Sequence, residues 1–262
     1  MGAEPVITVA GAPASGLILL CDHASNAFPP DLGTLGLPAS ELERHIAYDI
    51  GAAGVTRGMA ARLGAAAVFS CYSRLVIDCN RGADDPTLIM KLSDGAIVDG
   101  NRHVDATERE RRIAAYYAPY HAAIDREIDR SLAAGVVPVL VSIHTFTPIW
   151  RGVARAWHCG VLWDRDQRLS TPLIEALRAG GDLVVGDNEP YTGHLEGDCL
   201  YQHGTRRGLA HALIEIRQDL VGDEEGEAAW AERLSGIIDA IFADATRKRG
   251  LQTQLVGPNT LG

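Results

Sequence analysis

The sequence predicts an α/β fold, a three-layer αβα sandwich with a mostly parallel central sheet, and three observations indicate it. Short apolar runs rich in β-branched residues alternate with longer stretches whose apolar residues recur every three or four positions. Several short runs are apolar throughout, as are strands of a parallel sheet covered on both faces. The 262 residues contain no internal repeat or low-complexity linker. This length suits one catalytic domain over residues 1–262, with an ordered core at about 15–246.

Seven short runs are the predicted strands. In chain order they are residues 17–21, 66–69, 75–77, 136–143, 159–163, 183–185 and 212–216. Leucine, isoleucine and valine dominate these runs, which is typical of strands in a buried sheet.

Four longer stretches are the predicted helices, at residues 40–63, 107–134, 171–179 and 227–245. Three of them begin with residues that favour a helix N-terminus, because a hydroxyl can accept a hydrogen bond from a free amide and acidic residues or proline suit the first turn. These residues are Ser40 before Glu41 and Glu43, Thr107 before Glu108 and Glu110, and Ser170 before Pro172.

Two segments do not follow the alternation. Residues 81–104 are rich in Asp, Gly, Pro and Asn, and we expect a long excursion over one edge of the sheet. Long loops in compact domains are often functional. The tail after Arg249 shows no periodicity and is expected to be frayed.

Composition argues against several classes of function. Asp and Glu exceed Lys and Arg by 34 to 24, for a net charge of −10, whereas a nucleic-acid binder needs a basic face. No apolar run approaches the roughly 20 residues that span a bilayer, and no export signal is visible. The five cysteines form no CxxC pair, which predicts reduced thiols. We therefore expect a cytoplasmic protein without nucleic-acid or membrane partners; its oligomeric state is not indicated.

Polar residues follow the apolar runs at the carboxyl ends of strands, where ligands bind in parallel α/β sheets. They are Asp22, His23, Ser25 and Asn26 after the first run, Arg74, Asp78, Asn80 and Arg81 around the third, His144 at the end of the fourth, and Glu215 and Arg217 in the last. Two histidines at separate strand ends suit a metal such as zinc, which at catalytic sites takes about three protein ligands and leaves a position for water. A hydrogen-bonded strand-end histidine is the competing interpretation for either one alone.

A third ligand is expected from the helix that begins near Ser40. His45 and Asp49 are four residues apart, so both lie on one face of such a helix. Their spacing leaves the choice between them open. The shortage of lysine, with Lys91 and Lys248 alone, disfavours lysine-based covalent chemistry and leaves metal-activated water as the better nucleophile.

These residues lie in stretches that resemble the N-formylglutamate amidohydrolase family over roughly residues 15–245. The matching stretches are CDHASN (21–26), Asp49-Ile-Gly, SRLVIDCNR (73–81), SIHTFTP (142–148), GVARAWHCGVLWDRD (152–166), GDNEPYTG (186–193) and IEIRQDL (214–220). The family is similar in fold to zinc-dependent exopeptidases and to N-acetylmuramoyl-L-alanine amidases. The resemblance therefore implies a zinc-exopeptidase-like sandwich.

Carried over residue by residue, the resemblance implies that His23, Asp49 and His144 bind zinc, or another divalent metal, and that Glu215 is the catalytic glutamate. It selects Asp49 over His45. It implies hydrolysis of a linear amide, with N-formyl-L-glutamate as the first candidate substrate and a place in amino-acid catabolism such as histidine degradation. One departure concerns the substrate: glutamate-releasing members often have a Ser-Gly pair after the first histidine, where this chain has Ala24-Ser25-Asn26.

Further roles follow from this chemistry. Glu215 is expected to accept a proton from water and pass it to the departing amine. Arg74, Arg81 and Arg217 are candidates for binding substrate carboxylates or the oxyanion. For Arg217 an ion pair with Glu215 or Asp219 is an equal alternative, and Asp78 is either an acceptor for a ligating histidine or a plain strand-end carboxylate. The remaining candidates for substrate binding are Asn80, Ser25 and Asn26.

Other functions remain open at this point. An amidase for another N-acyl compound or for a muramoyl peptide would use the same metal chemistry. A module that binds a small carboxylate without catalysis would keep the fold and lose the metal. Metal content separates the enzyme from such a binding module.

Overall fold

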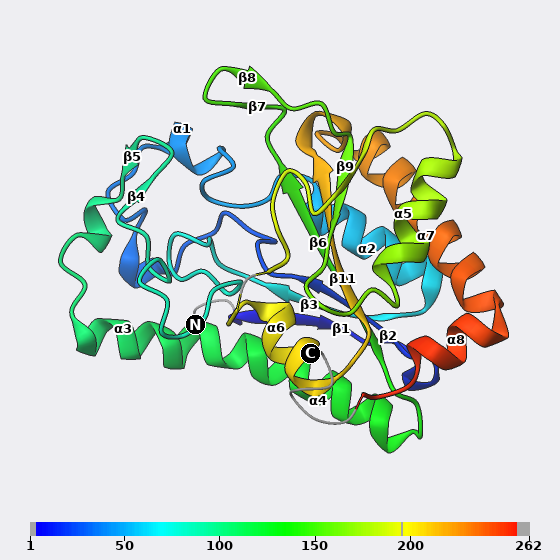
Figure 1. Cartoon of the computed structure of the whole chain (residues 1–262). Coiled ribbons are helices and arrows are strands. Elements are labelled where there is room, and N and C mark those ends of the chain that lie inside the picture. Colours follow the sequence, from blue (N-terminus) through cyan, green and yellow to red (C-terminus); the bar gives the residue numbers. More distant parts are fainter. Residues whose placement is uncertain (1–3, 195, 256–262) are drawn as a thin grey trace.

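The computed structural model describes residues 4–194 and 196–255 (Figure 1). At its centre is a seven-stranded sheet in the order β1-β3-β2-β6-β11-β9-β10. The strands are β1 (Val6–Val9), β2 (Leu17–Cys21), β3 (Ala66–Ser70), β6 (Val139–Phe146), β9 (Cys159–Leu162), β10 (Val185–Asp187) and β11 (His211–Arg217). Strands β3, β2, β6 and β11 run parallel to one another, while β1 is antiparallel to β3 and β9 to β11. The predicted fold class is confirmed.

Helices cover both faces of the sheet, which explains why its inner strands are buried along nearly their whole length. The helices are α1 (Ala39–Leu42), α2 (Ala52–Leu63), α3 (Ala106–Arg112), α4 (Ala118–Ala133), α5 (Ser170–Ala179), α6 (Cys199–His203), α7 (Glu224–Ala243) and α8 (Ala245–Leu251). Leu19 faces the core under α2, α5 and α7. Its neighbour Leu20 faces the second core, under α4 and α6.

The segment before α2 differs from the predicted helix. Helix α1 ends at Leu42 and α2 begins at Ala52. Between them the chain turns, and Gly51 takes a left-handed conformation with φ of 80° directly before the helix. Asp49 therefore precedes the helix and does not share a helical face with His45, and its backbone amide donates to the carbonyl of His23 at 3.0 Å.

Residues 75–77, a predicted strand, form a turn. Their carbonyls accept hydrogen bonds from side chains further along the chain: Asn101 in the excursion donates to the Leu75 carbonyl at 2.8 Å, and Arg112 in α3 donates to the Val76 carbonyl at 3.0 Å. The excursion contains the hairpin β4 (Leu92–Ser93) and β5 (Ala96–Ile97), and packs around Leu75 as a third core cluster. This buried apolar run forms a turn and not a strand, because polar side chains bind its carbonyls where a neighbouring strand would otherwise do so.

The residues that follow Arg249 are also more ordered than predicted. Helix α8 continues to Leu251, and the Leu255 amide donates to the Gly208 carbonyl at 2.9 Å. The expected fraying after Arg249 is therefore wrong up to residue 255, and the rest of the tail lies outside the described residues. All five cysteines are free, as predicted. Within the described ranges, no helix has the length and apolarity needed to cross a membrane.

Candidate active site

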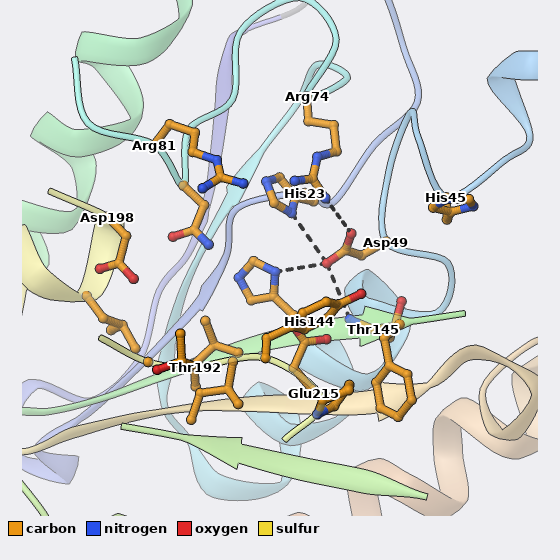
Figure 2. A pocket seen from close by; sticks show the side chains of 18 of the residues that line it. His23, His45, Asp49, Arg74, Arg81, His144, Thr145, Thr192, Asp198 and Glu215 are labelled. Atoms are coloured by element: carbon orange, nitrogen blue, oxygen red, sulfur yellow. Dashed lines mark hydrogen bonds and ion pairs between the residues drawn. The ribbon is translucent and has the colours of Figure 1, made fainter. Parts of the chain in front are cut away.

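Three parallel strands bring the candidate residues to one edge of the sheet. His23 follows β2, while His144 lies near the end of β6 and pairs in register with Glu215 on β11. Because β2, β6 and β11 run in the same direction, their carboxyl ends meet. Asp49 reaches the same point from the turn before α2, and Figure 2 shows its carboxylate facing both histidine rings.

The two histidines present the same ring atom to one carboxylate oxygen. Oδ2 of Asp49 lies 2.9 Å from Nδ1 of His144 and 3.4 Å from Nδ1 of His23. All three side chains are buried, and their potential ligand atoms lie within 4.8 Å of one another. The rings meet edge to face, with centroids 4.9 Å apart. This group could hold a metal ion.

A second carboxylate binds the outer nitrogen of each histidine. Nε2 of His23 lies 2.7 Å from Oδ1 of Asp78, and Nε2 of His144 lies 2.9 Å from Oδ2 of Asp22. When Nε2 carries the hydrogen that it donates to the carboxylate, Nδ1 keeps a lone pair directed at Asp49. Metal-ligating histidines in proteins show this arrangement. The donor set thus fits a divalent cation such as zinc.

The charges of the cluster also suit a cation. Burial alone raises the pKa of a carboxyl group, but charges and hydrogen bonds outweigh it, from His23 and His144 at Asp22 and Asp49 and from His23 and Arg74 at Asp78. The pKa values of all three carboxyl groups therefore lie below the usual range. Three ionised carboxylates therefore surround two histidines. Arg74 donates to Asp78 at 2.9 Å and to Asp49 at 3.4 Å, which orients both carboxylates.

The sequence did not single out the residues that support Asp22. Tyr120 in α4 donates to Oδ1 of Asp22 at 2.9 Å, and Ser142 in β6 donates to Oδ2 at 2.8 Å. Ser142 stands two residues before His144 on the same face of its strand, so its role had a local signal. Tyr120 lies on a helix distant in the chain, and no local sequence pattern indicated its role.

Glu215 is buried beside His144 with one carboxylate oxygen unengaged. Among the described residues, its Oε2 has no hydrogen-bond partner. Burial raises the pKa of Glu215 to about 7. A carboxyl group with this pKa can both accept and return a proton near neutral pH.

Two further candidates line the same cavity. Arg81 is 35% exposed, and its nearest carboxylate, Asp78, is 3.9 Å away, so its guanidinium can take a ligand. Asn80 accepts a hydrogen bond from the Cys199 amide at 3.2 Å, which orients its amide group. His45 also lines the cavity, but its imidazole lies 3.4 Å from Asp94 and outside the group around Asp49.

Three expected site residues are not brought into the cavity. Arg217 binds Asp219 at 2.7 and 3.1 Å and the backbone carbonyls of Arg155 and Trp157, which matches the ion-pair alternative with Asp219. Ser25 accepts a hydrogen bond from the Ala27 amide, and Asn26 donates to the Leu42 carbonyl. A catalytic role for Arg217 and substrate contacts for Ser25 and Asn26 are therefore not retained. These partners hold the three side chains outside the cavity.

The cavity has a volume of about 690 Å³ and extends beyond the titratable groups around Asp49. Loop 186–193 contributes lining residues that include Tyr191 and Thr192, and Trp150 and Trp163 form part of the wall. From Glu215 the lining continues to a group of buried residues under α6: Leu162, Leu200, Leu213, Thr205 and His211.

Known proteins resemble this chain in sequence and in fold. The family model described as N-formylglutamate amidohydrolase matches residues 15–221. N-formylglutamate deformylase of Pseudomonas aeruginosa is 25% identical over 201 residues, which cover 71% of this chain and 75% of that protein. The solved structure of gene product Atu2144 from Agrobacterium tumefaciens is 34% identical, with a TM-score of 0.86 over 93% of this chain and 97% of that one. N-formylglutamate amidohydrolase from Ralstonia eutropha JMP134 shares the fold at 22% identity, with a TM-score of 0.69 over 94% and 99% of the two chains.

Proposed function

The chain belongs to the N-formylglutamate amidohydrolase family, and from this premise we propose that it hydrolyses the amide bond of an N-formyl or N-acyl amino acid with the help of a bound zinc ion. N-formyl-L-glutamate is the first candidate substrate. One observation carries the proposal: both histidine Nδ1 atoms face one Asp49 oxygen while both Nε2 atoms are held by other carboxylates. Another divalent metal would meet the same donors.

His23, Asp49 and His144 would hold the metal. A divalent ion bound by such ligands polarises an amide carbonyl and brings the pKa of a water molecule to about 7. Asp22 and Asp78 keep the two imidazoles in the tautomer that leaves Nδ1 free for a ligand. Arg74 holds Asp49 and Asp78 in place and is a positioning residue.

Glu215 moves the proton in this proposal. Its free Oε2 accepts a proton from the attacking water and returns it to the amide nitrogen, so the amine can leave. A pKa of about 7 allows both steps near neutral pH. The register places Glu215 directly beside His144, so the proton acceptor adjoins the metal ligands.

Arg81 binds the substrate carboxylate. Its guanidinium has five donors in a fixed fork that suits a carboxylate, and its distance of 3.9 Å from Asp78 leaves that fork available. Asn80 lies next to it in the cavity lining and can donate from its side-chain amide to a substrate oxygen.

Formate release after metal removal and metal return tests the function. We expect the purified chain to lose deformylation of N-formyl-L-glutamate after chelation and to regain it with one equivalent of zinc. A chain that never hydrolyses an N-acyl amino acid, whatever the metal, contradicts the proposal and favours the alternative of a binding module without catalysis. Activity confined to muramoyl peptides would identify the other amidase class.

A further inference from the structure

The cavity continues well beyond the proposed metal ligands. Residues Glu215, Leu213 and His211 alternate along β11, so their side chains lie on one face of that strand. All three line the cavity. At roughly 3.3 Å per residue, the face from Glu215 to His211 extends for about 13 Å. We call the part of the cavity lined by Leu162, Leu200, Leu213, Thr205 and His211 the slot.

The walls of the slot are apolar and come from three elements. Leu213 lies on β11, Leu162 on the neighbouring strand β9, and Leu200 on α6, which covers this face. Each of the three leucines also packs in the second core and is at most 6% exposed, so only a narrow strip of each side chain faces the slot. A slot with such walls favours an apolar chain over a hydrated one, since it offers hydrocarbon contacts and few hydrogen-bond partners.

The far end of the slot is polar but does not carry a positive charge near neutral pH. Nε2 of His211 lies 3.2 Å from the Thr205 hydroxyl, and its Nδ1 lies 2.8 Å from the Leu209 carbonyl. Burial lowers the pKa of His211. The ring is therefore neutral at pH 7 and cannot form an ion pair with a substrate carboxylate.

The cavity offers few cationic groups to a substrate. In the described part of the lining, the arginines are Arg74 and Arg81, and Arg74 is already bound to Asp49 and Asp78. The lining also carries two acidic residues, Asp164 and Asp198, of which Asp198 directly precedes α6. Figure 2 shows Arg81 and Asp198 on the side of the pocket away from His45. One guanidinium is thus available for one carboxylate, and the described lining offers no second unengaged arginine for another.

We propose that the preferred substrates are N-acyl amino acids with one carboxylate, held by Arg81, and an elongated apolar group, held in the slot. This inference rests on the proposed function and narrows its substrate class. The apolar group is either the side chain of the amino acid or the acyl chain, since both are attached to the scissile amide. The two sources share the same chemistry and are separated by the experiment.

A substrate series on the zinc-loaded enzyme tests the proposal. In the first arm, N-formyl-L-alanine, N-formyl-L-norvaline and N-formyl-L-norleucine are compared with N-formyl-L-glutamate. In the second, N-acylglycines from formyl to hexanoyl are compared. We expect kcat/KM to rise roughly fourfold per methylene in one arm. The best apolar substrate should exceed N-formyl-L-glutamate at least tenfold. The arm that rises identifies which group occupies the slot.

A variant in which a larger side chain fills the slot provides the second measurement. Leu200→Trp should lower the ratio of kcat/KM for the longest to the shortest substrate at least tenfold. Leu92→Trp is the matched control, because Leu92 is 63% exposed and outside the cavity lining, and it should leave the ratio unchanged. If circular dichroism shows that Leu200→Trp is unfolded, Leu200→Ala replaces it and should shift the optimum to a longer chain.

Two negative results have different meanings. If N-formyl-L-glutamate is hydrolysed fastest and chain length has no effect in either arm, the slot proposal is wrong while the proposed function stands. If no compound in either arm is hydrolysed by the zinc-loaded chain, N-formyl-L-glutamate included, the proposed function itself fails.

Discussion

The Nε2 atom of His144 lies 2.9 Å from the Oδ2 atom of Asp22. The opposite nitrogen of the same ring lies 2.9 Å from Asp49. Asp22 is itself held by Tyr120 and Ser142. The orientation of the His144 imidazole is therefore determined by a hydrogen-bond network that includes α4, β6 and the end of β2, and metal affinity should depend on residues that do not touch the metal.

Asp22→Asn tests this network. An asparagine keeps the shape but removes the charge that supports the Nε2 hydrogen of His144, and partners of this kind are worth roughly 10- to 100-fold in metal affinity. We expect a zinc Kd raised by that factor in a competition titration with a chelator. Asp182→Asn is the matched control, since Asp182 pairs with Arg233 at the surface. Equal affinity in both variants would remove Asp22 from this role.

Glu215→Gln separates proton transfer from metal binding. Glutamine cannot accept the proton, and loss of a general base costs roughly 10²- to 10⁴-fold in rate. We expect zinc content equal to that of the wild type, measured by elemental analysis, together with a fall in kcat of that size. A variant with full zinc and wild-type kcat would show that another group accepts the proton.

Arg81→Ala should weaken substrate binding more than turnover. A charge-assisted hydrogen bond to a carboxylate is worth about 1.5–3 kcal/mol, which corresponds to a KM increase of roughly 10- to 100-fold. Steady-state kinetics with any hydrolysed N-acyl amino acid provides the measurement. Arg217→Ala is the comparison, because Arg217 is bound to Asp219 and lies outside the cavity lining. If Arg217→Ala raises KM more than Arg81→Ala does, the carboxylate assignment is wrong.

Asp198 should make stability depend on pH. Burial raises the pKa of Asp198 to about 7 from an ordinary value of 3.8. The folded state then binds the proton more tightly than the unfolded state, so the contribution of Asp198 to stability falls as pH rises from about 4 to 7 and stays low above that. The full difference corresponds to roughly 4 kcal/mol.

Asp198→Asn should remove this dependence. Asparagine also serves as a helix N-cap, so the bond to the Tyr201 amide can remain. Urea unfolding at pH 5 and pH 8 measures the effect: the gain of the variant over the wild type should be larger at pH 8. A larger gain at pH 5 would mean that Asp198 is ionised in the folded protein.

Much of the fold and three positions of the site were predictable from local patterns. Strands β2, β6 and β11 are rich in apolar residues, and the polar residues near their ends, His23, His144 and Glu215, meet because parallel strands end at one edge. The sequence stretch before α2 was harder. A helical spacing there was compatible with either His45 or Asp49, but the chain turns at residues 43–51 and brings Asp49 alone between the histidines.

Other features depend on residues far apart in the chain. The turn at residues 75–77 is stable because Asn101 and Arg112 bind its carbonyls, and no local sequence pattern predicts those partners. Arg217 alternates with Glu215 on β11 and was therefore expected in the same site. Asp219 and the carbonyls of Arg155 and Trp157 instead hold its guanidinium outside the cavity. The slot likewise needs α6, a short helix that the apolar periodicity did not reveal.

The zinc content of His144→Ala is the most direct test of the proposed metal site. The wild-type chain, stripped with a chelator, reloaded with zinc and desalted, should retain one equivalent. His144→Ala should retain far less, and His103→Ala, which removes an exposed histidine outside this cavity, should retain as much as the wild type. Full zinc occupancy in a folded His144→Ala protein would contradict the metal site formed by His23, Asp49 and His144.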